Sequence, residues 1–155
     1  MYGLGRLHKP DWRDLNYLVA PPETVTSTSR YWIAPSPLDQ NGHPHCVAFA
    51  ALHHLLAAPT VHWRHRDLLP TTDYLYHESQ LIDEWPGEEY DGTAVRAVAK
   101  VLVALGRVRE YRWAITPEDM KQFVLERGPL IMGTEWHREM FYPDIDTGFI
   151  KPEGE

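Results

Sequence analysis

A single cysteine, Cys46, stands immediately before an apolar stretch, residues 47–58, that predicts a helix buried on most of its faces. The first amide groups of a helix have no partners within that helix and carry about half a positive charge. A thiolate placed there is stabilised, which makes the sulfur a better nucleophile at neutral pH. The alternative is an inert, buried cysteine that only fills space in the core.

Gln40 lies six residues before the cysteine, across a loop that contains Gly42 and Pro44. Such a loop can fold the glutamine amide back beside the thiol. The amide and the backbone N–H of Cys46 would then form an oxyanion hole, which stabilises the negative charge that develops when a nucleophile attacks a carbonyl. The pair Gln40 and Cys46 therefore predicts acyl-transfer chemistry more strongly than either residue alone.

The segment from Gln40 to Ala50 resembles the active-site segment of papain-like cysteine peptidases, in which a glutamine and a glycine-containing turn precede a cysteine that opens a Cys-x-Ala-Phe-Ala helix. Four further segments resemble bacterial and phage members of that superfamily, in the same order along the chain. They are Asp11–Tyr17 (an Asp-x-Arg-Asp lead-in), Asp91–Arg96, Arg127–Leu130 and Thr147–Ile150.

The resemblance implies an α+β, papain-like fold. A central buried helix starts at Cys46, part of an antiparallel sheet or barrel half follows, and a peptide or protein substrate binds in the cleft between the two parts. It implies peptide-bond hydrolysis without a cofactor or metal, with Cys46 as the nucleophile and Gln40 in the oxyanion hole. Residues 1–155 then form a single domain, expected to be incomplete, with an irregular lead-in over residues 1–30.

The chain departs from the family pattern at three places. His43 stands where a second cysteine is common, and Val47 stands where a tryptophan is common. The family's catalytic histidine and its orienting asparagine follow the strand that resembles residues 148–150, and the printed sequence ends at Glu155 before both. Because thiol catalysis needs a base, we expect this chain alone to be inactive or nearly so.

Three explanations of the absent histidine compete: a longer protein, a pseudoenzyme, or a substitute base. Among the nine histidines, His137 is the only downstream candidate for that substitute. The pseudoenzyme alternative is a non-catalytic papain-like structural or binding module in a larger assembly, for example a phage particle. A thiol peptidase that processes bacteriocin leaders would also space Gln and Cys closely, but the lead-in at Asp11–Tyr17 argues against it.

Several histidines near the cysteine raise a metal-binding alternative. Zinc sites usually combine two pairs of closely spaced ligands. His43, His45 and Cys46 offer closely spaced donors, and His62 with His65 offers two more. The fit is loose because no complementary cysteine pair exists, so we predict no metal.

The elements that must position these residues follow from periodicity and capping. Helices are expected over residues 47–58, 73–81, 93–105 and 117–126, with Thr93 and Thr116 as N-caps and Gly106 in a left-handed C-terminal turn. Strands are expected over Pro129–Thr134 and Gly148–Ile150. Helices followed by strands, without alternation, predict the α+β class.

Composition limits the partners. The formal net charge of −7 disfavours nucleic-acid binding, and the short basic run at residues 62–66 is interpreted as a solvated loop. No stretch has the length and apolarity of a membrane span, and no signal peptide is recognisable. We therefore expect a cytoplasmic or virion-associated protein whose partners are polypeptides.

Overall fold

The computed structural model describes residues 5–20, 22, 24–59, 68–85, 87 and 89–151. The basic run at residues 62–66 lies outside these ranges. The elements in chain order are η1 (Trp12–Tyr17), α1 (Cys46–Leu56), α2 (Thr72–Ile82), α3 (Val95–Ala104), α4 (Pro117–Glu126) and η3 (Arg138–Phe141). None of these described helices has the length and apolarity needed to cross a membrane.

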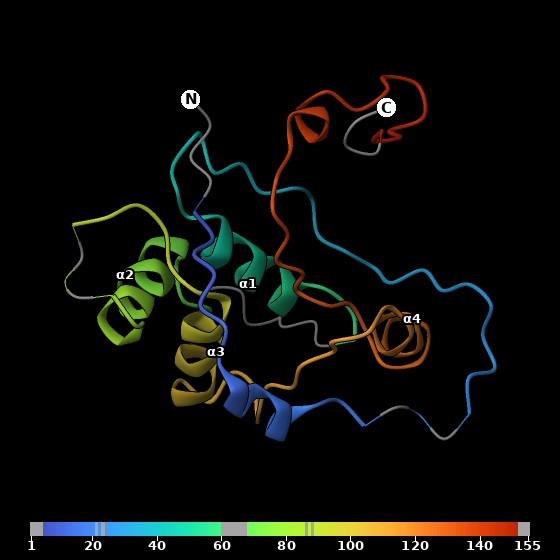
Figure 1. The fold of residues 1–155 in the computed structure, drawn as a ribbon, viewed down its shortest axis with the longest axis horizontal. Coiled ribbons are helices and arrows are strands. Elements are labelled where there is room, and N and C mark those ends of the chain that lie inside the picture. The colour runs from blue at the N-terminus through green and yellow to red at the C-terminus, as the bar shows by residue number, and fades with distance from the viewer. Residues whose placement is uncertain are drawn as a thin grey trace.

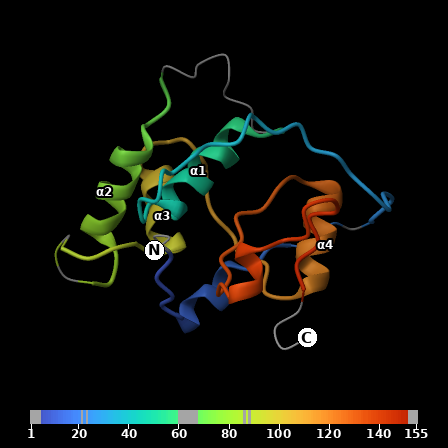
Figure 2. The ribbon, with the colours of Figure 1, turned by 90° about the horizontal axis from the view of Figure 1, so that it is seen from above.

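Helices α1, α2 and α3 pack against one another and enclose the hydrophobic core (Figure 1). Helix α1 contributes the most deeply buried side chains, including Ala48, Ala51 and Leu55, and its partners contribute Leu75 and Val98. Helix α4 lies apart from this group in both ribbon views, next to the chain that leads to the C-terminus (Figure 2). The first residue of α1 is therefore held by a packed three-helix unit.

The four predicted α-helices are confirmed, with the ends of the first three shifted by one or two residues. The predicted N-cap Thr116 accepts a hydrogen bond from Asp119 N, and Gly106 adopts φ of 63°. The predicted cap at Thr93 is wrong. Ala94 occupies the N-cap position of α3, while the Thr93 hydroxyl donates to Asp83 at 2.7 Å.

The predicted α+β class with an antiparallel sheet is contradicted, because the described residues contain helices and no strand. Residues 129–134 are extended but unpaired, and residues 148–150 belong to a local turn in which Asp144 N donates to Phe149 O and Gly148 N to Asp144 O. A segment of high β-propensity forms a sheet only when a neighbouring strand pairs with it. Here no backbone hydrogen bond joins residues 129–134 to residues 148–150. Of the described residues, only two isolated parallel bridges are β-like, Arg6 to Thr93 and Leu18 to Trp113.

Backbone hydrogen bonds and ion pairs attach the N-terminal segment to the helices. Thr93 N donates to Gly5 O, and Leu7 N donates to Thr93 O, each at 2.9 Å. Further along, the buried Arg96 of α3 forms ion pairs with Asp14 of η1 and with Glu84. Two of the motifs noted in the sequence, the lead-in and the segment around Arg96, therefore meet in space.

Candidate functional site

Cys46 is the first residue of α1 and is half-buried. The helix begins there because Phe49 N donates to His45 O at 3.0 Å, which closes the first turn. Val47 and Ala48 point into the core, so the rotation of α1 about its axis is fixed. The sulfur consequently lies at the positively polarised end of the central helix, where anionic groups are stabilised.

Gln40 belongs to a tight turn that ends just before α1. Its side-chain amide donates to the carbonyl oxygen of His43 at 2.7 Å, and His43 N donates to the backbone oxygen of Gln40 at 3.0 Å. Asn41 and Gly42 have φ of 49° and 77°, the left-handed conformation that allows so sharp a reversal. The glutamine amide is therefore folded back onto its own loop, against the carbonyl of His43, three residues before Cys46.

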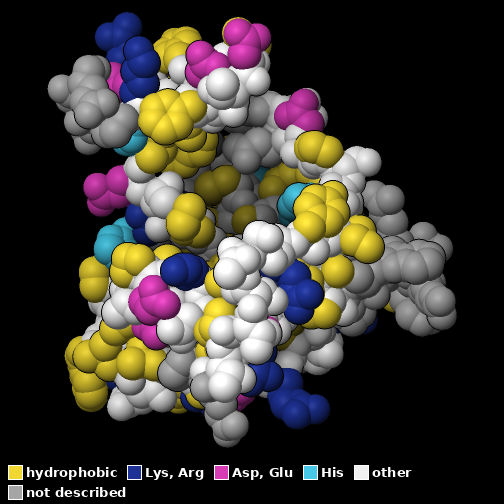
Figure 3. Space-filling view, turned by 90° about the vertical axis from the view of Figure 1, so that its right-hand side faces the viewer, with side chains coloured by type: hydrophobic (Ala, Val, Ile, Leu, Met, Phe, Trp, Pro, Cys, Tyr) yellow, Lys and Arg dark blue, Asp and Glu magenta, His cyan; other side chains and the backbone are white. Residues whose placement is uncertain are grey.

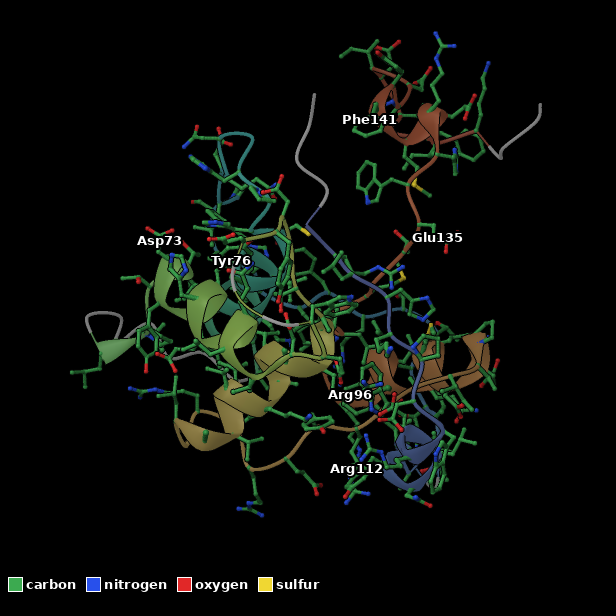
Figure 4. The ribbon with its side chains drawn as sticks, turned by 60° about the vertical axis from the view of Figure 1, so that its left-hand side comes forward. Asp73, Tyr76, Arg96, Arg112, Glu135 and Phe141 are labelled. Atoms are coloured by element: carbon green, nitrogen blue, oxygen red, sulfur yellow. The ribbon has the colours of Figure 1, made fainter. Side chains whose placement is uncertain are left out.

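His45, the N-cap residue of α1, packs between the loop and α2. Its ring stacks on Tyr76, with centroids 3.8 Å apart, and its Nδ1 lies 3.4 Å from a carboxylate oxygen of Asp73. Burial lowers the pKa of His45. The negative charge of Asp73 raises this pKa, but by less than burial lowers it. Figure 4 shows Asp73 and Tyr76 on the side of α2 that faces the start of α1.

Tyr76 connects this corner to the loop before α3. Its hydroxyl accepts hydrogen bonds from Gly92 N at 2.9 Å and from Gln80 Nε2 at 3.0 Å. Burial raises the pKa of the Tyr76 hydroxyl, and the nearby charges of Asp91, Asp83 and Cys46 raise it further. Tyr76 and Asp73 carry no chemical signal in the sequence beyond their place on one face of a predicted helix.

The N-terminal segment also supports the nucleophile loop. Gly5 is buried, and a Cβ at this position would lie 1.7 Å from the carbonyl oxygen of Pro44, two residues before Cys46. A Cβ on Gly92 would lie 2.6 Å from Gly5 O. Glycine is required at both positions because backbone packs directly against backbone.

His137 lies on the chain that follows α4. It precedes η3, and its Nδ1 is 3.0 Å from Glu139 Oε2. Among the described residues, no hydrogen bond, ion pair or ring contact joins His137 to Cys46. Figure 4 shows the neighbouring residues Glu135 and Phe141 on the opposite side from Asp73 and Tyr76.

Within the described residues, no three side chains of His, Cys, Asp or Glu gather closely enough to hold a metal ion. A cavity of about 660 Å³ lies between η3 and the last described residues, and its lining includes Arg138, Tyr142, Phe149 and Lys151. None of the lining residues belongs to the Cys46 loop.

No family model, curated protein or solved structure matches the chain.

Proposed function

We propose that Cys46 is the nucleophile of a thiol-dependent peptidase of the papain-like type, and that Gln40 and the Cys46 backbone N–H bind the oxyanion. The observation that carries this proposal is the position of the only thiol at the first residue of α1, with the Gln40 amide folded back along the same turn. The attacking thiolate forms a bond to the peptide carbonyl carbon, and the amine then leaves as the C–N bond breaks.

The neighbouring residues support a nucleophile at this position. Val47 and Ala48 lock the helix into the core, and Gly5 supports the loop at Pro44. A rigid supporting structure is what a catalytic group needs in order to stay within reach of its substrate.

The proton must move from the thiol to the leaving amine through a base. His137 is the candidate substitute, and its Nδ1 lies 3.0 Å from Glu139 Oε2 on the chain that follows α4. To serve, it would have to approach Cys46 together with the segment that carries it. We therefore expect slow turnover of peptides, and the nucleophile is best tested by a ligand that needs no base.

A peptide aldehyde is such a ligand, because a thiolate adds to it reversibly and the resulting oxyanion tests the hole directly. With a ¹³C-labelled aldehyde carbon, we expect a hemithioacetal NMR signal that is absent in Cys46→Ser. Gln40→Ala should weaken binding by at least about tenfold, as expected for the loss of one oxyanion donor.

Gln122→Ala is the matched control for Gln40→Ala, because this glutamine donates to Glu118 on α4 and has no part in the turn. It should bind the aldehyde as the wild type does. Equal binding by the Gln40 and Gln122 variants would refute the oxyanion role. The absence of any hemithioacetal would refute the nucleophile.

A second function, a non-catalytic polypeptide-binding module, is favoured by one observation. The apolar side chains Met132, Trp136, Tyr142 and Phe149 are all exposed on the chain that follows α4. Exposed apolar groups concentrated in one region are typical of interaction sites. If the aldehyde forms no adduct while the folded protein still binds polypeptides, this second function replaces the first.

A further inference from the structure

Residues 129–136 form an extended segment directly after α4. In the part of the chain that the structure describes, no backbone N–H or C=O of these residues is hydrogen-bonded. Their sequence, Pro-Leu-Ile-Met-Gly-Thr-Glu-Trp, contains β-branched and aromatic residues that favour strands. The segment therefore presents a row of unpaired donors and acceptors, as the edge of a sheet does.

Two contacts hold this segment in place. Ile131 packs against the hydrophobic core of α1–α3, and the side chain of Arg6 lies so close to Gly133 that a Cβ there would be 2.6 Å from Arg6 Cδ. Met132 is 71% exposed and Trp136 is 50% exposed, so apolar side chains also face solvent along the segment. An edge that is already extended loses less conformational entropy on pairing than a disordered chain does.

We propose that residues 129–136 are an open strand that pairs with an extended strand of a partner polypeptide. Only another extended main chain matches a row of alternating N–H and C=O groups, and apolar side chains on that strand would cover Met132 and Trp136. A second copy of this chain is disfavoured, because each copy has a net charge of −7 and the two would repel. The partner strand is therefore neutral or basic.

Figure 3 shows the side of the molecule on which α4 and the C-terminal chain lie, and hydrophobic side chains surround a hollow on this face.

Pairing at residues 129–136 does not depend on the thiol chemistry of Cys46, since the pairing groups belong to the backbone of another segment. Cys46→Ser is expected to bind the partner strand as the wild type does.

The test uses the whole chain and a labelled peptide of alternating valine and lysine as the probe. We expect saturable binding by fluorescence anisotropy, and at least about tenfold weaker binding for the same peptide N-methylated at every second amide. Met132→Pro, which removes one N–H from the edge, should weaken binding similarly. Met132→Thr removes the same side chain but keeps the N–H, so it should lose only the apolar contact and weaken binding less than Met132→Pro does.

Hydrogen exchange locates the binding. The amides of residues 130–136 should exchange rapidly in the free protein and at least about tenfold more slowly with saturating peptide. Slow exchange of these amides in the free protein, whether from internal pairing or from a dimer seen in sedimentation, would overturn the proposal. So would failure of the peptide to bind, equal binding of the N-methylated peptide, or protection elsewhere only.

Discussion

Gln40 and Cys46 stand at the two ends of one loop, in which the Gln40 amide donates to the His43 carbonyl and Cys46 opens α1. Gly42 permits the left-handed turn and the apolar run after Cys46 fixes the helix, so both features were predictable without knowledge of the fold. The stack of His45 on Tyr76 was not predictable, because it depends on how α2 packs beside α1. Contacts between residues distant in sequence are set by tertiary packing, which periodicity alone does not determine.

His54, on the buried side of α1, gives the first prediction at this scale. Burial lowers its pKa below the ordinary value of 6.5, and among the described polar atoms its Nδ1 is buried without a partner. The unfolded chain therefore binds the proton more readily, so the free energy of unfolding should fall as the pH drops through about 6.5 toward the lower folded-state pKa. His54→Leu should flatten this dependence in urea titrations between about pH 7 and pH 5.

His8→Gln is the control for that titration, because the side chain of His8 is exposed. It should retain the wild-type pH dependence. An unchanged slope in His54→Leu, or the same flattening in both variants, would show that His54 is not the group whose protonation destabilises the fold.

Helices and the expected strands differed in how far the sequence determined them. Helix α4 begins at Pro117 after the cap Thr116, as predicted, because capping and periodicity are local signals. The runs at residues 129–134 and 148–150 have strand-like composition but no paired partner in the described structure. A β-strand needs a second segment that pairs with its backbone, and composition does not show whether one is present. The strand-like composition of these runs therefore predicted the wrong fold class.

The ion pairs that attach η1 to α3 are expected to stabilise the fold. Arg96 is buried and its guanidinium meets Asp14 and Glu84, so Arg96→Ala leaves two carboxylates without their cation. Because both carboxylates are partly exposed, the expected loss is about 2–3 kcal/mol, below that of a fully buried pair. Chemical denaturation measures this loss.

Arg112→Ala is the matched control, since Arg112 pairs with Glu110 on the surface and both side chains are exposed. Removal of an exposed, solvent-screened pair should cost clearly less than the loss of Arg96. Figure 4 shows both arginines. Equal losses for the two variants would contradict the view that the Arg96 cluster fastens the lead-in to the helices.

The support of the Cys46 loop by the N-terminal segment predicts a steric effect. Gly5→Ala would drive a methyl group into the carbonyl of Pro44, so we expect a loss of about 2–3 kcal/mol and a changed rate of Cys46 alkylation. Gly106→Ala also replaces a glycine, but the space around it is open. That control should cost about 1 kcal/mol, from its positive φ alone, without altering the cysteine. Equal effects on Cys46 in both variants would exclude specific support by Gly5.

The whole molecule divides into a packed helical unit and an open C-terminal part. The core residues of α1, α2 and α3 are buried, whereas Met132, Tyr142, Ile145 and Phe149 are exposed. This division was not predicted, because the expected sheet would have buried the same apolar residues. It implies that local stability is highest in the helices and lowest after Gly128.

Limited trypsin digestion tests that division. Cleavage after Arg138 should precede cleavage after Lys100, because Arg138 is exposed in a short 3₁₀ turn while Lys100 lies within the packed helix α3. The expected initial product retains all the residues of α1–α3 and a cooperative unfolding transition. Earlier cleavage at Lys100, or simultaneous loss of both regions, would contradict the division.

The reactivity of Cys46 tests the account most directly, because it is the only thiol in the chain and mass spectrometry reports its alkylation without ambiguity. At about pH 6, a nucleophilic Cys46 at the start of α1 should react with iodoacetamide at least about tenfold faster than N-acetylcysteine does. A rate equal to or below that of the free thiol would contradict the claim that Cys46 is a nucleophile.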